Sequence, residues 1–244
     1  MNNQATLDQL HSLRLSGMAS VFTSALSLPM QERPSIEYFM AKLTEAELQE
    51  RSNKKTTMYL KTSKLRYNAT LENIKCSTER NLSKETVFSL SDCSFVKRAE
   101  NLLITGKTGC GKSFLACALG RQACHFGIRT IYLAMNKFIE KIELSKIDGS
   151  FIKVINQIEK NDLVIFDDFG LQPLTTNTRL ALLQILEDCF ERKSVIITSQ
   201  LPVSKWFEYI NEPTIADAIM DSITSNAHRI ELDGDTMRNK NINY

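Results

Sequence analysis

The sequence predicts an α/β fold, in which a parallel sheet carries helices on both faces, preceded by a small all-helical N-terminal domain. From residue 99 onward, short apolar segments alternate with amphipathic ones, as in parallel sheets with crossover helices. Before residue 67, apolar residues recur three to five positions apart, which is typical of helices. We therefore expect a helical domain at 1–66, a connecting segment at 67–98 and an α/β core at 99–244.

The N-terminal domain is expected to contain helices only. Residues 5–28 place their apolar side chains on one face, with a break near Gly17, and Pro29 ends the helix. Ser35 is a candidate N-cap for a second helix, which continues into a basic stretch. The segment at 67–98 is rich in Ser, Thr and Asn, which favours short elements and turns.

The basic stretch at 51–66 contains no acidic residue, although the net charge of the whole chain is only +2. A local excess of this kind suits contact with the phosphate backbone of a nucleic acid, and a solvated helix face is the alternative interpretation. The candidate DNA-binding residues are Arg51, Lys54, Lys55, Lys61, Lys64 and Arg66.

The core is expected to alternate strands and helices. The expected strands are 101–105, 129–134, 162–167, 194–199 and 228–232. The expected helices are 112–125, 136–146, 150–160, 176–192 and 214–223. The apolar character of the strands is typical of a sheet that is covered on both faces.

A glycine-rich loop follows the first expected strand. Residues 106–113 read GKTGCGKS and match the phosphate-loop pattern G-x-x-x-x-G-K-[ST], between a strand and a helix. Backbone N–H groups and the helix N-terminus attract phosphate oxygens, so the loop predicts nucleotide binding. Lys112 is expected to reach the β- and γ-phosphates, and Ser113 to bind Mg²⁺. The candidate ATP-binding residues are Gly106, Lys107, Thr108, Gly109, Cys110, Gly111, Lys112 and Ser113.

Two acidic residues follow the apolar part of the third expected strand. Asp167 is expected to hold Mg²⁺ together with Ser113, and Asp168 to act on the water that attacks the γ-phosphate. Acidic residues often end a strand, but downstream of a phosphate loop such a pair predicts an Mg²⁺-dependent ATPase.

The fourth expected strand ends in Thr198, Ser199 and Gln200, at the sheet edge where ligands bind in open α/β folds. One of these side chains is expected to contact the γ-phosphate, and the sequence leaves the choice among them open. Ser199 is included with Lys112 and Asp168 among the expected catalytic residues.

Composition limits where the protein is expected to act. Hydrophobic residues make up 43% and charged residues 24%, as in ordinary globular proteins. The chain has no run of 18 apolar residues, and its first residues do not resemble a secretion signal. Its six cysteines form no C-x-x-C pair. We expect reduced thiols, a cytoplasmic location and no membrane contact.

Several segments resemble a known family, the IstB-like ATPases, which are the transposition helper proteins of one insertion-sequence family. These are AAA+ proteins related to the DnaC helicase loaders. The resemblance covers nearly the whole chain, and TSQLPV and PTIADAI favour this family over the helicase loaders. It is carried by LRLSGM (13–18), LRYNATL (65–71), ENLLITG (100–106), LACALG (115–120), DDFGLQPL (167–174), TSQLPV (198–203), PTIADAI (213–219) and NAHRIEL (226–232).

The resemblance implies an AAA+ core without a C-terminal helical lid. It also implies homo-oligomers with ATP between subunits, assembly on double-stranded DNA and recruitment of a transposase. Ser222 stands where the family typically has an arginine that reaches the ATP of a neighbouring subunit. Arg229 is the candidate substitute and completes the expected catalytic set. The alternative interpretation, that Arg229 is an ordinary arginine at the edge of a strand without a catalytic role, has equal weight. Without such an arginine, hydrolysis is expected to be slow.

The predicted function is therefore that of an ATP-dependent, DNA-binding helper of transposition. The first alternative is a DnaC-like replicative helicase loader with the same core. A small-molecule kinase with a phosphate loop is the second, and the paired acids and the lack of an evident acceptor lid disfavour it.

Overall fold

The chain divides into two compact units between Met58 and Tyr59 in the computed structural model, which describes residues 2–237. The division falls inside a long helix, α3 (Ile36–Ser63), and not after residue 66 as expected. Residues 59–98, including the segment expected to be a connection, therefore belong to the second unit.

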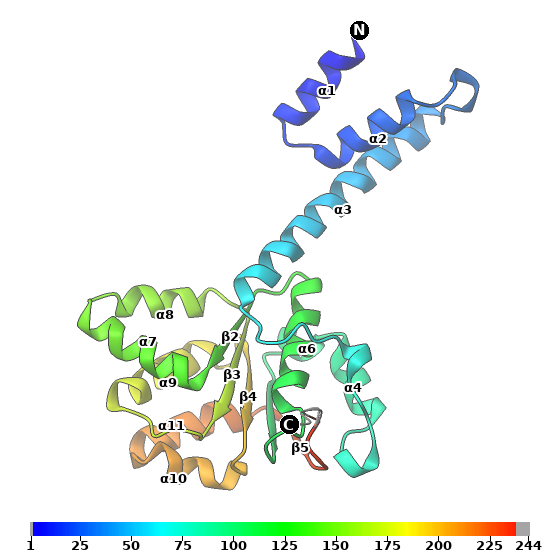
Figure 1. Ribbon diagram of the computed structural model, residues 1–244. Coiled ribbons are helices and arrows are strands. Elements are labelled where there is room, and N and C mark those ends of the chain that lie inside the picture. Colours follow the sequence, from blue (N-terminus) through cyan, green and yellow to red (C-terminus); the bar gives the residue numbers. More distant parts are fainter. Residues whose placement is uncertain (1, 238–244) are drawn as a thin grey trace, which may run out of the picture. The chain divides into compact units, whose positions relative to one another are not determined.

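The first unit contains helices only (Figure 1). α1 (Asn3–Ser12) and α2 (Ser16–Leu26) are separated at residues 13–15, and the 3-10 turn η1 (Met30–Glu32) precedes α3. The break comes just before Gly17 because this glycine packs against α3, where a Cβ would lie 2.4 Å from the Ala46 carbonyl oxygen. The buried Glu47 carboxylate accepts a hydrogen bond of 2.9 Å from the Gly17 N–H, which satisfies a donor in the first turn of α2.

A five-stranded parallel sheet forms the centre of the second unit, in the order β2-β3-β4-β1-β5. The sheet confirms the expected parallel α/β core, and its strands lie close to the expected ranges. They are β1 (Asn101–Gly106), β2 (Thr130–Ala134), β3 (Leu163–Phe169), β4 (Ser194–Ser199) and β5 (Ala227–Leu232). Because β4 lies between β1 and β3, the end of β4 separates the phosphate loop from the two acids.

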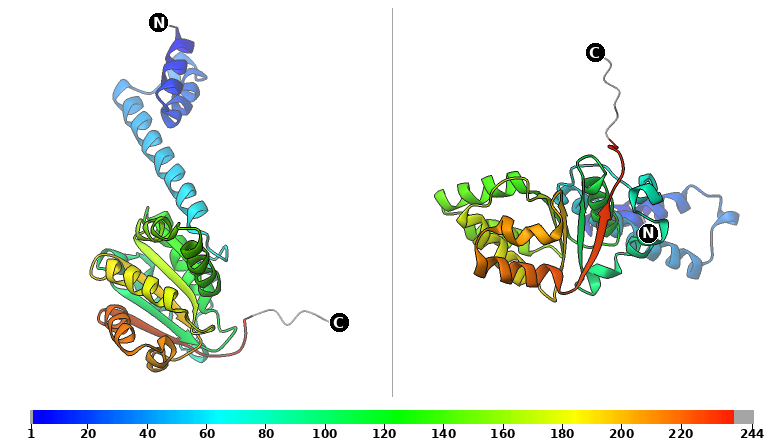
Figure 2. Two further views of the ribbon diagram at one scale, coloured as in Figure 1. Left: turned by 90° about the vertical axis from the view of Figure 1, so that its left-hand side faces the viewer. Right: turned by 90° about the horizontal axis from the view of Figure 1, so that it is seen from below.

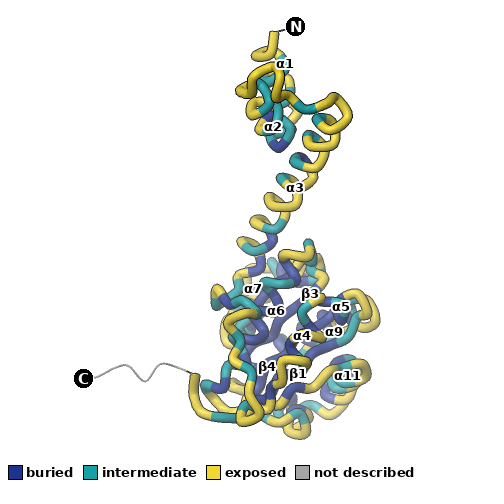
Figure 3. The backbone as a smooth tube through the Cα atoms, turned by 90° about the vertical axis from the view of Figure 1, so that its right-hand side faces the viewer, coloured by how far each residue is buried: buried dark blue, intermediate teal, exposed yellow. Residues whose placement is uncertain are grey.

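Helices cover both faces of the sheet, as the right-hand view of Figure 2 shows. α4 (Lys84–Ser91), α5 (Ser94–Lys97) and α6 (Lys112–His125) lie on one face. The other face carries α7 (Met135–Ile147), α8 (Phe151–Glu159), α9 (Thr176–Cys189), α10 (Trp206–Ile210) and α11 (Pro213–Thr224). The central strands β1, β3 and β4 are buried along most of their length (Figure 3), which explains their largely apolar sequences. The edge strand β5 is mostly exposed or half-buried.

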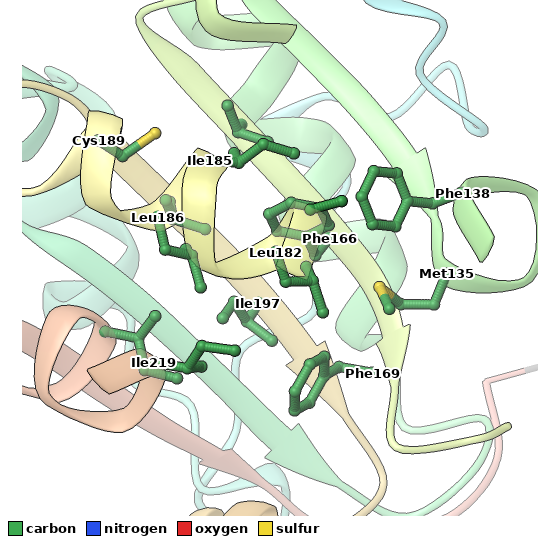
Figure 4. Close-up of a cluster of buried hydrophobic side chains, with 14 of the residues drawn as sticks. Met135, Phe138, Phe166, Phe169, Leu182, Ile185, Leu186, Cys189, Ile197 and Ile219 are labelled. Atoms are coloured by element: carbon green, nitrogen blue, oxygen red, sulfur yellow. The ribbon is translucent and has the colours of Figure 1, made fainter. Parts of the chain in front are cut away.

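Each face of the sheet has its own hydrophobic cluster. In the cluster beneath α7 and α9, the rings of Phe138 and Phe166 meet edge to face with their centroids 5.4 Å apart (Figure 4). The opposite cluster includes Ala69, Leu82 and Leu90. These residues show that 67–98 is a packed part of the core and no simple connection, because its apolar side chains are buried beside α6.

Two further expectations concern membranes and the C-terminal lid. Within residues 2–237, no helix is both long and apolar enough to cross a membrane. Residues 233–237, which follow β5, form no helix. The rest of the region in which a lid would fall, 238–244, lies outside the described residues.

Candidate active site

The phosphate loop connects β1 to the N-terminus of α6 and depends on its glycines. Gly106, Gly109 and Gly111 have φ values of 142°, 86° and 93°, which side chains with a Cβ rarely adopt. A Cβ on Gly106 would also lie 2.1 Å from the carbonyl oxygen of Leu232. The loop can therefore follow this path only with glycine at these positions.

Lys112 lies at the start of α6, and its side chain is folded against the loop. The residue is buried, and its Nζ donates hydrogen bonds of 2.7 Å to the Gly106 carbonyl and 2.8 Å to the Lys107 carbonyl. The Lys107 side chain points elsewhere and forms an exposed pair with Asp233 at 3.2 Å. Lys112 is thus the cation that the fold holds at the mouth of the loop.

A cavity of about 320 Å³ adjoins the loop. The loop residues that line it are Thr108, Gly109, Gly111, Lys112 and Ser113. Gly106, Lys107 and Cys110 were also expected at the ligand, but they shape the loop from outside the cavity lining. Asp168 lines the same cavity, so the structure brings the acid and the phosphate loop together across one space.

The two acids lie at a bulge in β3. The pairing of β3 with β4 shifts between Phe166 and Phe169, which leaves Asp167 and Asp168 outside the regular register. Asp168 has a φ of +62°, a conformation that costs a non-glycine residue about 1–3 kcal/mol. The bulge gives the two neighbouring acids different environments, with Asp168 beside the cavity and Asp167 fully buried.

Thr198 on β4 holds both acids in place. Its hydroxyl donates a hydrogen bond of 2.5 Å to Asp167 Oδ1 and accepts one of 3.1 Å from the Asp168 N–H. The Tyr132 hydroxyl donates to Asp167 Oδ2. Burial first, and then this hydrogen bond, raise the pKa of Tyr132, so the phenol stays protonated as a donor.

Of the three polar residues at the end of β4, Gln200 is the one that lines the cavity. Its Oε1 accepts a hydrogen bond of 2.7 Å from the Thr108 hydroxyl. Ser199, which was included among the expected catalytic residues, is fully buried. Its hydroxyl donates to the Phe169 carbonyl at 2.5 Å and accepts from the Leu201 N–H at 3.0 Å. Gln200 therefore faces the cavity and Ser199 faces the core, because successive residues at the strand end point in different directions.

The opposite wall of the cavity comes from the segment expected to be a connection, and sequence reasoning missed it. Its lining residues are Tyr67, Asn73, Ile74, Lys75 and Arg80. The Arg80 guanidinium donates a hydrogen bond of 2.7 Å to the Cys110 carbonyl and another to the Lys75 carbonyl. Arg80 thus adds a positive charge beside the loop. A single arginine among polar residues carries no pattern that would have predicted this role.

Arg66 was expected to bind DNA, but it lies beside the two acids. Its Nη1 is 3.6 Å from Asp168 Oδ2 and 3.8 Å from Asp167 Oδ2, and its guanidinium lies over the Tyr67 ring at 5.2 Å. The side chain remains 46% exposed. Arg66 therefore differs in position from Arg51 and Lys54, which pair with acids on α3.

Ser222, which stands where the family typically has an arginine, and Arg229, the candidate substitute for that arginine, both lie away from this cavity. Arg229 is exposed on β5, where it pairs with Leu103 in the middle of β1. Ser222 lies on α11, and its backbone carbonyl accepts a hydrogen bond of 3.1 Å from the side chain of Asn101, at the start of β1. Neither residue lines the cavity of its own chain.

Together, these residues define a phosphate-loop ATPase. A glycine loop, a buried lysine and a helix N-terminus can hold a polyphosphate, and Asp168 can take a proton from a water beside it. The chain belongs to the family of IstB-like ATP binding proteins, which it matches over residues 8–243.

Two relatives match along most of their length. The chain is 39% identical to the insertion sequence ATP-binding protein y4pL of Sinorhizobium fredii, over 96% of this chain and 95% of the relative. It is 38% identical to the ATP-binding protein of insertion sequence IS1162 of Pseudomonas fluorescens, over 84% and 89%. The chain is therefore a transposition-associated ATPase of this family.

Solved structures of AAA+ proteins share the fold. AMPPCP-bound DnaA from Aquifex aeolicus aligns with a TM-score of 0.59 and 21% identity, over 70% of this chain and 52% of DnaA. The DnaC helicase loader aligns with a TM-score of 0.56 and 17% identity, over 68% of this chain and 98% of the loader. At this level of identity the likeness establishes the AAA+ fold alone.

Proposed function

We propose that this ATPase assists DNA transposition by assembling as a homo-oligomer on double-stranded DNA and recruiting a transposase. The observation that carries the proposal is the likeness, along nearly the whole chain, to ATP-binding proteins of insertion sequences. The cavity between the phosphate loop and Asp168 supports ATP as the ligand that controls assembly.

ATP is proposed to lie with its phosphates on the loop and its base toward Tyr67, Ile74 and Phe114. These residues form the apolar and aromatic part of the cavity, and the rings of Tyr67 and Phe114 lie 6.1 Å apart. Lys112 and Arg80 place positive charge at the phosphate end. An elongated ligand with one aromatic and one anionic end matches this distribution.

The site also suits Mg²⁺. Within residues 2–237, no cluster of three His, Cys, Asp or Glu side chains could hold a metal by itself. Mg²⁺ usually takes only one or two carboxylates together with phosphate oxygens, so the hydroxyl of Ser113, which lines the cavity, would hold it there. Asp167 lies outside the cavity lining with its two carboxylate oxygens bonded to Thr198 and Tyr132, so it would hold the ion only if one of these bonds opened. When bound, the ion would neutralise phosphate charge.

Hydrolysis is proposed to depend on Asp168 as the proton acceptor for the attacking water. Thr198 positions Asp168 through the backbone and keeps Asp167 from rotating. Gln200 is placed to contact the terminal phosphate or the water, because it lines the cavity between the loop and β3.

Completion of the site by a neighbouring subunit is proposed through Arg229. This residue is exposed on the edge strand β5, so it is accessible to a second copy. Because Ser222 lacks the charge of an arginine finger, we propose that turnover is slow and that ATP binding itself drives assembly.

The basic stretch is proposed to contribute to DNA binding. Arg51 and Lys54 form pairs with Glu47 at 2.8 Å and Glu50 at 3.1 Å. The exposed Lys54–Glu50 pair is worth about 0–1 kcal/mol, so a phosphate can compete for Lys54. The guanidinium of Arg51 is exposed as well, although its partner Glu47 is buried. Lys61 lies on the exposed surface near the end of α3.

A replicative helicase loader remains the weaker alternative. The DnaC likeness has 17% identity, whereas the insertion-sequence relatives reach 38% and 39% over most of this chain. Capture of a hexameric helicase, without capture of a transposase, would favour the loader.

The test compares wild-type protein with Lys112→Ala and Asp168→Asn. We expect the wild type to form DNA-bound assemblies only with ATP and Mg²⁺, and these assemblies to retain an insertion-sequence transposase added to the mixture. Lys112→Ala should lose assembly, because the phosphates lose their cation. Asp168→Asn should assemble but stop turning over ATP. The measurements are light scattering, DNA anisotropy and phosphate release.

The control is Lys153→Ala, an exposed lysine on α8 that does not line the ATP cavity. Normal phosphate release by Asp168→Asn would contradict its role as proton acceptor. If the wild type binds DNA equally well with and without ATP, ATP-controlled assembly is contradicted.

A further inference from the structure

A second cavity of about 630 Å³ adjoins the ATP cavity on the other side of Asp168. It lies within the second unit, along the end of β2 and the first turns of α7. Asp168 lines both cavities, so a ligand in the second one would lie beside the proposed proton acceptor.

The second cavity is lined by four cations: Lys64, Arg66, Lys137 and Lys141. Lys137 and Lys141 are four positions apart on α7 and therefore share one helix face. Lys64 and Arg66 follow the last turn of α3, where Lys64 has a φ of +56°. Two segments distant in the sequence thus bring positive charges to one space.

Within the part of the chain that the structure describes, the three lysines of the second cavity are not paired with acidic side chains. Among residues 2–237, no carboxylate oxygen lies within 4.0 Å of the ammonium nitrogens of Lys64, Lys137 or Lys141. Partial burial, and then the charge of Lys64, lower the pKa of Lys141. Like charges that repel one another in a partly buried space favour a polyanionic ligand, because its negative charge would offset their repulsion.

Arg66 connects this cavity to the chemistry. It lines the second cavity and lies 3.6 Å from the Asp168 carboxylate. A pair this long and half exposed is weak, and a phosphate that accepts two guanidinium N–H bonds is a stronger partner. While Arg66 stays beside Asp168, its guanidinium competes with the attacking water for that carboxylate.

We propose that the second cavity binds backbone phosphates of double-stranded DNA, and that a bound phosphate draws Arg66 away from Asp168 and so accelerates ATP hydrolysis. This inference rests on the proposed function, since it assumes a DNA-binding ATPase. The polar amides of Gln157 and Gln172 in the lining add hydrogen-bond donors for phosphate oxygens.

The experiment uses the full-length protein and a fluorescein-labelled DNA duplex. DNA affinity is measured at several salt concentrations, and phosphate release is measured with and without the duplex. Lys137→Gln with Lys141→Gln should lower the slope of log affinity against log salt by about 1.8, because two phosphate contacts disappear. Its phosphate release with DNA should fall to its own rate without DNA.

Matched variants separate a local effect from a loss of charge. Lys153→Gln with Lys160→Gln removes the same charge from exposed positions outside the cavity lining and should keep both the slope and the stimulation. Lys137→Arg with Lys141→Arg should restore both. Arg66→Gln should release phosphate at a rate that no longer rises with DNA. Circular dichroism and thermal melting show that each variant is folded.

The outcomes distinguish this inference from the proposed function. If wild-type protein does not bind the duplex, both fail. If the wild type binds and is stimulated, but the cavity variant behaves like its matched control, only the cavity inference fails. Phosphate release is also measured with tripolyphosphate in place of DNA. If the Lys137→Gln, Lys141→Gln variant loses stimulation by tripolyphosphate but keeps stimulation by DNA, the cavity binds a free polyanion. Unchanged DNA affinity with loss of transposase capture would assign it to a protein partner. Either result would overturn the inference.

Discussion

At the scale of single residues, the active site depends on neighbours with opposite roles. Asp167 is fully buried and Asp168 lines two cavities, although they are adjacent in the sequence. Ser199 is buried and bonded to the backbone, whereas Gln200 lines the ATP cavity. The sequence places all four at strand ends, but only the bulge in β3 and the turn after β4 decide which side chain faces the cavity.

The contrast between Ser199 and Gln200 gives a direct prediction. Gln200→Ala should reduce the rate of phosphate release at least tenfold while the protein keeps its melting temperature, because the side chain lines the cavity and supports little packing. Ser199→Ala should lower the melting temperature and leave turnover at saturating ATP nearly unchanged, because a buried hydrogen-bonded hydroxyl is worth about 1 kcal/mol. A tenfold loss of turnover in Ser199→Ala alone would reverse the assignment.

At the scale of elements, β4 is the central piece of the site. Its position between β1 and β3 sets Thr198 beside the acids and Gln200 beside the phosphate loop. The alternation of strands and helices along the chain predicts a parallel sheet. The same alternation is compatible with many orders of the strands within that sheet. The order follows from which strand pairs bury the most apolar surface, and that is a property of the whole core.

Near the start of β1, the carboxylate of Glu100 connects this strand to β5. The Glu100 carboxylate pairs with Arg98 at 2.8 Å and with His228 on β5 at 2.9 Å. The Arg98 hydrogen bond first, and then that of His228, lower the pKa of Glu100 to about 2. Since the folded pKa is below the unfolded one, this contribution to stability is present above the unfolded pKa and is lost as pH falls toward 2.

We therefore expect Glu100→Gln to melt at a lower temperature than wild type at neutral pH, with a gap that narrows between pH 4.5 and pH 2. Differential scanning calorimetry of the two proteins across this window measures the gap. Glu187→Gln on α9 is the control, since it removes an exposed carboxylate with no cation within 4.0 Å among the described residues. A gap that stays constant with pH would exclude titration of Glu100 as its cause.

At the scale of the whole molecule, the ATP cavity lies in the second of two compact units. The single tryptophan, Trp206, is fully buried in that unit, where its ring contacts Phe169. Its fluorescence therefore reports unfolding of the second unit. Any ligand that binds only the folded state stabilises that state by mass action.

AMPPCP with Mg²⁺ should raise the melting temperature reported by Trp206, by an amount equivalent to about 2.7 kcal/mol at a hundredfold excess over its dissociation constant. The helices of the first unit, followed by circular dichroism in a fragment of residues 1–58, should not respond. Lys112→Ala should abolish the shift. An equal shift in this variant would place the nucleotide somewhere other than the phosphate loop.

The sequence by itself determined the parallel α/β core, the phosphate loop and the pair of acids, because these depend on local periodicity and on residue types at fixed spacing. The family membership also followed from contiguous segments. Only the tertiary structure showed that 67–98 forms a wall of the ATP cavity and that Arg66 lies beside Asp168. It also showed that Gln200 lines the cavity whereas the Ser199 side chain is buried. These features depend on contacts between residues far apart in the chain, and such contacts leave no periodic signal in the sequence.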